Sequence, residues 1–182
     1  MIPENSFFYF GYNSEYVGYI SPYNPFLENV MLDTTDRRIL ALLQEDATIA
    51  IADIAERVGL SATPCWKRIK RLEQAGIIDR RVAILNRARL GLGVTVIVAV
   101  RTARHSEDWL QTFAEGVARI PEVLEFYRMS GEIDYLLKIV AHDIADYDRI
   151  YRKLTKVADL RDVSSSFAMQ EIKSTTSLPL FE

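Results

Sequence analysis

Several residue types and patterns are scarce in this chain of 182 residues, and each scarcity excludes a class of protein. Cysteine occurs once, at Cys65, so an intramolecular disulfide is excluded and a reducing compartment is favoured. No apolar run approaches the ~20 residues that a membrane helix needs. No Lys or Arg precedes Arg37, so the basic start of a secretory signal is also missing. Together these observations predict a soluble, cytoplasmic protein with no membrane partner.

Patterns for catalysis and metal binding are equally scarce. His105 and His142 are the only histidines, and neither has a Cys or His neighbour at metal-ligand spacing. Cys65 falls on the apolar side of a helical pattern, where it is most simply a small core residue. The serines at 164–166 lack the strand–turn–helix context of a nucleophile elbow. We therefore expect no enzyme, no metal site and no cofactor.

The most informative stretch runs from Ala52 to Gly76 and predicts two helices joined by a tight turn. Gly59 can take the positive φ that ends the first helix, and Ser61 is a good N-cap for the second. Gly76 then ends the second helix. Its apolar residues recur at helical spacing on one face: Cys65, Ile69 and Leu72. This is the pattern of a helix-turn-helix.

The flanking segments extend this unit and concentrate positive charge in it. LDTTDRRILALLQEDA upstream predicts a capped third helix, and residues 77–85 are Ile- and Val-rich, which we interpret as a small β-wing. From Leu60 to Leu90 eight Lys or Arg stand against two Asp or Glu, while the whole chain carries −3. Segregated positive charge is what phosphate binding requires. A winged helix-turn-helix that binds double-stranded DNA is predicted.

The second half alternates between strand and helix patterns. The expected elements, in order, are a strand at Val94–Val100, a helix at Ser106–Arg119 capped by Ser106, strands at Val123–Met129 and Asp134–Val140, a helix built on Ile144, Tyr147, Tyr151 and Leu154, and a strand at Val163–Lys173. The order β-α-β-β-α-β is that of a ferredoxin-like domain. The fold class is therefore α+β, with an N-terminal winged helix-turn-helix and a C-terminal ferredoxin-like domain.

From Met31 to its end the chain resembles the Lrp/AsnC (leucine-responsive/asparagine-operon, or feast/famine) family of transcriptional regulators. The resemblance rests on the order and spacing of LDTTDRRILALLQEDA, IAERVGLS, SATPCWKRIKRLEQAGII, YRMSGEIDYLLKIV and TTSLP. Ala50 departs from it, since the family often caps the second helix with Ser or Thr. The resemblance implies a ferredoxin-like domain that dimerises and binds effectors, and an assembly of four dimers in a ring.

Four segments follow from these patterns: 1–30, 31–85 (DNA-binding domain), 86–93 (linker) and 94–182 (effector and oligomerisation domain). Residues 1–30 lie outside the resemblance and carry nine aromatic and no basic residues. They are either an upstream extension from a start codon assigned too early or an aromatic arm that packs on a partner subunit. Deleting them should leave DNA binding intact.

Both ligand sites can be assigned to residues. On the second helix of the helix-turn-helix, the expected DNA contacts are Ser61, Thr63, Trp66, Lys67, Arg68, Lys70 and Arg71. The loop between the two middle strands has two readings: a hairpin with solvated acids, or a site for a free amino acid, which the resemblance favours. The residues concerned are Met129, Ser130, Gly131, Glu132, Asp134, Tyr135 and Leu136, with Thr175 and Thr176 approaching from a neighbouring subunit.

Within that loop, Asp134 would accept the ligand ammonium and the amides of 130–132 would bind its carboxylate. Met129, Tyr135 and Leu136 would shape the side-chain pocket. The resulting hypothesis is a DNA-binding regulator tuned by a small molecule, most simply an amino acid. Two alternatives stay open: an effector-independent DNA-packaging protein, and a sensing or scaffolding protein that does not bind DNA.

Overall fold

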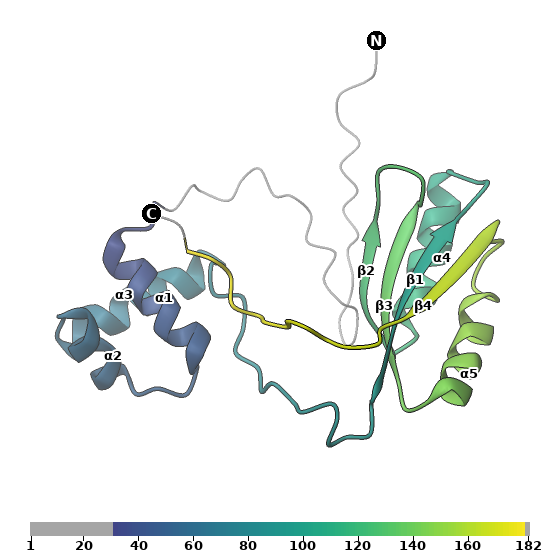
Figure 1. Ribbon diagram of the computed structural model, residues 1–182. Helices are drawn as coiled ribbons and strands as arrows, with labels where there is room; N and C mark the ends of the chain where they lie inside the picture. Colours follow the sequence, from purple (N-terminus) through teal and green to yellow (C-terminus); the bar gives the residue numbers. More distant parts are fainter. Residues whose placement is uncertain (1–30, 181–182) are drawn as a thin grey trace, which may run out of the picture. The chain divides into compact units, whose positions relative to one another are not determined.

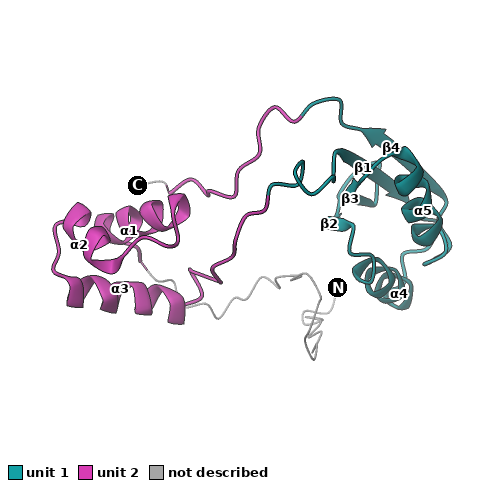
Figure 2. Cartoon of the chain, turned by 90° about the horizontal axis from the view of Figure 1, so that it is seen from below, with its two compact units in different colours: residues 1–20, 86–170 teal, residues 21–85, 171–182 magenta. Residues whose placement is uncertain are grey.

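The computed structural model describes residues 31–180, so the aromatic extension 1–30 lies outside it. The described residues form two compact units (Figure 2). We call residues 31–85 with 171–180 the helical unit, and residues 86–170 the sheet unit. The C-terminal segment therefore belongs with the helices, and segment 86–93 with the sheet. Both assignments differ from the segment boundaries expected from the sequence.

The helical unit contains α1 (Thr34–Glu45), α2 (Ile51–Val58) and α3 (Ala62–Gln74), labelled in Figure 1. Asp33 caps α1: its Oδ1 accepts the N–H of Asp36 at 2.7 Å, and the Asp36 carboxylate accepts the N–H of Asp33 at 3.3 Å. This reciprocal pair is a capping box. The core between the helices is formed by Ile39, Leu40, Ile54, Ala55, Cys65, Ile69 and Leu72.

The turn between α2 and α3 forms as predicted. Gly59 ends α2 with φ +73°, and the N–H of Leu60 donates to the carbonyl of Ala55 at 2.8 Å. Gly76 has φ +69° beyond the end of α3. Ser61 is the N-cap residue of α3, as predicted, although its hydroxyl makes no capping hydrogen bond. The N-cap residue of α2 is Ala50, whose side chain cannot cap the helix.

The predicted β-hairpin of the wing is absent from residues 77–85, which form no strand within the described chain. The side chains of Val82, Ile84 and Leu85 are 60–72% exposed. A two-stranded hairpin is marginal unless a further strand or helix covers its apolar face. Nothing in the helical unit covers these three side chains, which accounts for the absence of strand pairing in this segment.

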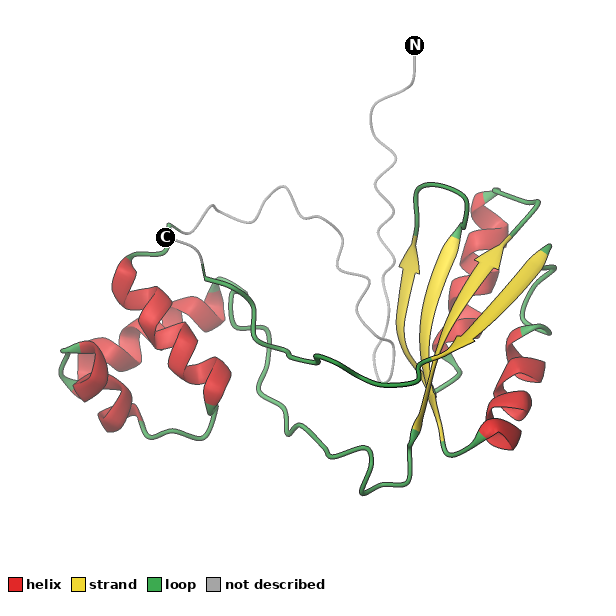
Figure 3. Cartoon of the chain, in the orientation of Figure 1, coloured by secondary structure: helices red, strands yellow, loops and turns green. Residues whose placement is uncertain are grey.

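The sheet unit is a four-stranded antiparallel sheet covered by two helices (Figure 3). Its elements are β1 (Val94–Arg101), α4 (Glu107–Ala118), β2 (Val123–Arg128), β3 (Tyr135–Ala141), α5 (Ile144–Leu154) and β4 (Asp162–Phe167). The strand order β2-β3-β1-β4 and the βαββαβ sequence confirm the predicted ferredoxin-like fold. Ser106 caps α4, as expected, by accepting the N–H of Trp109.

Strand alternation decides which side chains face α4 and α5. Val96, Val98 and Val100 of β1 are buried in the core around Phe113 of α4. Ile97 and Ala99 point to the opposite face and are only partly buried, so β1 is fully buried on one face alone. We call that opposite surface the open face of the sheet.

The last strand is shorter than predicted. Strand β4 ends at Phe167, which pairs with Val96, and the N–H of Ala168 donates to the carbonyl of Thr95. Strand β1 begins only two residues before Val96, so a longer β4 would run past its partner. Residues 168–173, expected to continue the strand, are exposed and form no strand.

Segment 86–93, expected to be a linker, makes hydrogen bonds of its own and also contacts the rest of the sheet unit. The N–H of Leu90 donates to the carbonyl of Asn86 at 3.2 Å, and Gly91 turns the chain with φ +76°. The carbonyl of Gly91 lies 3.0 Å from Nδ1 of His142. These contacts fix the point at which the chain enters β1.

Gly116 in α4 provides a test of this packing. A Cβ added there would lie 2.1 Å from Cγ1 of Val157, so Gly116→Ala should lower the free energy of unfolding by about 1–3 kcal/mol through overpacking. Gly93→Ala is the matched control, because its Cβ would meet nothing within 4 Å. Urea unfolding followed by tryptophan fluorescence in a Trp66→Phe background, where Trp109 is the sole tryptophan, measures both. A Gly116→Ala protein as stable as the control would refute the contact.

Candidate DNA interface and effector site

The outer face of α3 presents four side chains at helical spacing. Thr63, Trp66, Lys67 and Lys70 lie at i, i+3, i+4 and i+7 and are exposed, with Trp66 46% exposed. The opposite side of the helix carries the buried Cys65, Ile69 and Leu72. We call the four exposed residues the outer face of α3.

The lysines of this face differ in their partners. Lys70 pairs with Glu73 at 2.6 Å, and Arg81 also reaches Glu73, at 3.2 Å. Hydrogen bonding and charge from Lys70 hold the pKa of Glu73 below its ordinary value, so this carboxylate is ionised at neutral pH. Lys67 has no ion-pair partner among residues 31–180. It is therefore the ammonium on this face that no carboxylate neutralises.

Ser61 and Thr63 stand at the N-terminal end of α3, and both are exposed. Since the Ser61 hydroxyl makes no capping bond, it is available to an outside partner. Backbone N–H groups at a helix start carry partial positive charge and favour anions such as phosphate. The start of α3 thus suits a nucleic-acid backbone.

Arg68 and Arg71, also expected to contact DNA, form ion pairs with carboxylates at the start of α1, and the Arg71 side chain remains 49% exposed. The Nη1 of Arg68 lies 2.6 Å from Oδ2 of Asp33 and 2.8 Å from Oδ1 of Asp36. Arg71 contacts the other oxygen of Asp36, whose side chain is only 1% exposed. Both guanidinium groups therefore turn back to the start of α1, because a buried carboxylate needs a cation.

In the sheet unit, the loop between β2 and β3 is closed by the N–H of Met129, which donates to the carbonyl of Asp134 at 2.8 Å. Gly131 takes φ +128°, a conformation that L side chains rarely adopt. The Oδ2 of Asp134 accepts the N–H of Thr102 at 2.8 Å, and its Oδ1 lies 3.9 Å from Nδ1 of His105. Asp134 is 27% exposed, whereas the Glu132 side chain is 94% exposed.

A shallow hollow of about 670 Å³ begins at this loop and is lined by Arg101, Glu132, Arg161 and Asp162. The Nε of Arg101 donates to the carbonyl of Glu132 at 2.9 Å. Two cations and two anions thus meet where β1 ends and β4 begins. Local sequence patterns do not point to Arg101, Arg161 or Asp162, because only the strand register that opposes Arg101 to Asp162 brings them to the loop.

Tyr135 was expected to shape the effector pocket, and the structure contradicts that placement. It is 3% exposed and packs against Trp109, Phe113 and Phe126 in the core. Strand alternation is the reason, because Tyr135 points to the helices and Leu136 to the open face. Met129, 39% exposed, remains beside the loop.

Thr175 and Thr176, expected to approach an effector from a neighbour, lie in the exposed C-terminal segment of the helical unit. The hydroxyl of Thr175 accepts the N–H of Ser177 at 3.1 Å. In the same segment, the N–H and carbonyl of Leu178 form two hydrogen bonds with the carboxamide of Gln44 in α1, at 2.6 and 3.2 Å. These bonds attach the segment to α1.

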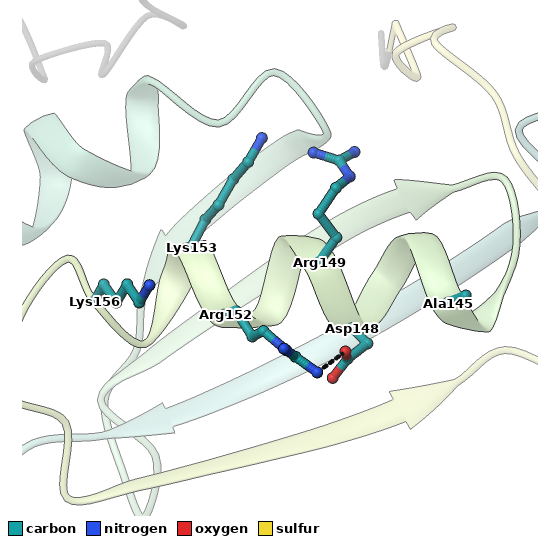
Figure 4. Close-up of a pocket in the computed structure, with 6 residues that line it drawn as sticks. All are labelled: Ala145, Asp148, Arg149, Arg152, Lys153 and Lys156. Carbon is teal, nitrogen blue, oxygen red and sulfur yellow. Dashed lines mark ion pairs between the residues drawn. The ribbon is translucent and has the colours of Figure 1, made fainter.

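A second hollow lies on α5, where Arg149, Arg152, Lys153 and Lys156 gather (Figure 4). Most of this charge is already neutralised. Arg149 bonds to Glu122 and Asp146, both at 2.7 Å, and Arg152 bonds to Asp148 at 2.7 Å. The carboxylates of Glu122 and Asp146 raise the pKa of Arg149. This surface is a self-paired charged helix face and not a second anion site.

Across residues 31–180 the structure brings together no group of three or more His, Cys, Asp or Glu able to hold a metal ion. None of the helices in that range is both long and apolar enough to cross a membrane.

Comparisons with known proteins match both units. The winged helix-turn-helix DNA-binding family matches residues 32–79, and the Lrp/AsnC ligand-binding domain matches residues 95–178. The Escherichia coli DNA-binding transcriptional activator DecR is 50% identical over 151 residues, which cover 82% of this chain and 99% of that protein.

Two solved structures have the same fold. An AsnC-family transcriptional regulator from Agrobacterium tumefaciens is 55% identical, with a TM-score of 0.79 over 81% of this chain and 97% of that one. A transcriptional regulator from Neisseria meningitidis, solved in complex with L-methionine, is 38% identical, with a TM-score of 0.78 over 82% and 97%.

Proposed function

The chain belongs to the Lrp/AsnC family of DNA-binding transcriptional regulators, and we propose that the outer face of α3 carries its DNA contacts while an amino acid binds at the β2–β3 loop. In this proposal residues 31–85 bind DNA and residues 94–182 bind the effector and oligomerise. The protein would act in the cytoplasm, where bacterial DNA lies.

The observation that supports the DNA contacts is the exposure of Thr63, Trp66, Lys67 and Lys70 along a helix whose other side is buried. The N-terminal half of a recognition helix reaches deepest into the major groove. Ser61 would bind phosphate at the start of the helix, and Lys67 and Lys70 would bind it further along. Arg68 and Arg71 would hold the helix through their ion pairs with Asp33 and Asp36.

The test measures affinity for a duplex selected by the protein from a random library and for a random duplex, each across a salt series. A sequence-specific regulator prefers the selected duplex and loses affinity as salt rises. An effector-independent packaging protein would bind both duplexes alike. A protein that uses its helix-turn-helix only for protein contacts would bind neither.

For the effector we propose a free amino acid, with Asp134 accepting its ammonium and the amides of Ser130–Glu132 receiving its carboxylate. Arg101 and Arg161, which line the adjoining hollow, supply positive charge for that carboxylate. Met129 and Leu136 remain as residues that shape the pocket. The L-methionine complex of the Neisseria relative supports an amino acid as the ligand class. A thermal-stabilisation screen of the common amino acids tests it.

The open face of the sheet supports a homodimer. Ile97, Ala99 and Leu136 are apolar there, and register sets Leu136 opposite both Ala99 and Tyr127. Val82, Ile84 and Ile172 of the helical unit and Met169 of the sheet unit also expose apolar side chains. Burying such surface drives association. We propose a sheet-to-sheet dimer, with four dimers forming an octamer.

Ile97→Asp tests this assembly. Placing a carboxylate in a buried sheet–sheet interface leaves it unpaired, so dimer affinity should fall on the order of a hundredfold. Ile144→Asp is the matched control: Ile144 is 70% exposed at the start of α5, where an acid is well tolerated. Light scattering at micromolar concentration measures the mass of each variant's assembly. If both variants keep the parental mass, the dimer uses another surface.

A further inference from the structure

Asp36 is a buried charged residue in the unit that binds DNA. It is 0% exposed, and both of its carboxylate oxygens are bound by arginines from α3. Arg68 donates to Oδ1 at 2.8 Å, and Arg71 donates to Oδ2. An ionised carboxylate is costly to bury unless it is paired in this way. The side chain thus links the start of α1 directly to the recognition helix.

Asp33 completes the cluster. The Nη1 of Arg68 also donates to Oδ2 of Asp33 at 2.6 Å, and the N–H of Asp36 donates to Oδ1 of Asp33 at 2.7 Å. The N–H of Asp36 and the guanidinium of Arg68 hold the pKa of Asp33 below its ordinary value, so it is ionised at neutral pH. Two anions therefore face two cations, and the cluster carries no net charge.

This cluster fixes the rotation of α3 about its own axis, which its apolar contacts do not fix. Cys65, Ile69 and Leu72 bury one side of the helix, but apolar burial is non-directional and permits small rotations. Guanidinium–carboxylate pairs have defined geometry, and here two of them, three residues apart along the helix, meet one rigid carboxylate. They set the rotation of α3 and hence the direction of Thr63 and Trp66.

The same contacts withhold two cations from DNA. Of the four basic residues on α3, Arg68 and Arg71 are held by Asp33 and Asp36, and Lys70 is paired with Glu73. Every additional free cation strengthens binding to any sequence, because phosphates are the same everywhere. Neutralising the arginines lowers this indiscriminate part of the affinity.

We propose that the cluster of Asp33, Asp36, Arg68 and Arg71 is a specificity device, in which Asp36 is a positioning residue for the recognition helix and a competitor of DNA phosphate for Arg71. This proposal rests on the DNA binding proposed above. Loss of the Asp36 charge lets α3 rotate, so its outer face no longer points at the base edges, and sequence discrimination falls. It also releases Arg71 to bind phosphate, so affinity for random DNA rises.

The test is Asp36→Asn, measured with a 30-bp duplex selected by the parent protein and with a random duplex of the same length. We expect the ratio of the two affinities to fall about tenfold or more, the size of losing one base contact. The salt dependence on random DNA should steepen by about one phosphate contact. A merely structural role would weaken binding without steepening that slope.

Two further variants separate the effects. In Asp36→Asn with Arg71→Gln the released cation is gone, so the slope should return to the parental value while discrimination stays low. Asp33→Asn replaces Asp36→Asn if the latter does not fold. Asn is an equally good N-cap, so this substitution removes only the charge. It should steepen the slope, since Arg68 is then held by Asp36 alone.

Folded Asp36→Asn and Asp33→Asn proteins with parental slopes and a parental affinity ratio would overturn the specificity role. An unfolded Asp36→Asn protein together with a parental Asp33→Asn protein would overturn it too, leaving a purely structural ion pair. A parent protein that binds neither duplex would instead remove the proposed DNA contacts, and that outcome is distinct from the others.

Discussion

A Lys67→Glu protein should bind every DNA duplex, selected or random, on the order of a hundredfold more weakly than the parent at physiological salt. Lys67 is exposed on the outer face of α3 and has no ion-pair partner in the described chain, so a carboxylate there would face phosphate directly. One phosphate contact is also lost, which should make the salt dependence shallower by about one. Fluorescence anisotropy across a salt series measures both.

Lys156→Glu is the matched control, because it changes the net charge by the same amount at the end of α5. It should leave affinity for DNA within about twofold, since the long-range field of one surface charge is screened beyond ~8 Å at this ionic strength. Equal weakening by the two substitutions would mean that overall charge, and not the outer face of α3, governs binding.

Local patterns predicted the helical unit well because its signals act over a few residues. Gly59 and Gly76 adopt the positive φ that their positions indicated, and Cys65, Ile69 and Leu72 are buried as their spacing required. Arg68 shows where such reasoning ends. Its helical position alone suggested a DNA contact, whereas its partners Asp33 and Asp36 lie 35 and 32 residues earlier in the chain. Only the packing of α1 on α3 reveals them.

The sheet unit shows the same limit. Alternation and turn residues predicted the order of its elements, which the structure confirms. The length of β4 depends on where β1 begins, and the inward direction of Tyr135 depends on which face the helices cover. The hollow at Arg101 and Asp162 depends on strand register, which one-dimensional periodicity does not set.

Asp134→Asn should weaken effector binding on the order of a hundredfold or more, while leaving folding and effector-free DNA binding nearly unchanged. A bound zwitterion must have both charges compensated, and Asn keeps the shape of Asp but not the charge that would balance an ammonium. Folding survives because the side-chain oxygen of Asn can still accept the N–H of Thr102, as Oδ2 of Asp134 does at 2.8 Å. Calorimetry with the amino acid that gives the largest thermal stabilisation measures the loss.

The matched control is Glu132→Gln, two residues earlier in the same loop. Its side chain is 94% exposed; its carbonyl accepts a hydrogen bond from Arg101 at 2.9 Å, and its carboxylate lies 3.7 Å from Nη2 of the same arginine in a solvent-exposed ion pair. A solvated carboxylate contributes little to binding, so this variant should lose less than about threefold in affinity. The contrast separates a specific contact at Asp134 from a general effect of negative charge in the loop. If Asp134→Asn binds the effector as tightly as the parent while Glu132→Gln does not, the ammonium is held by Glu132 at the mouth of the hollow, and the assignment to Asp134 is wrong.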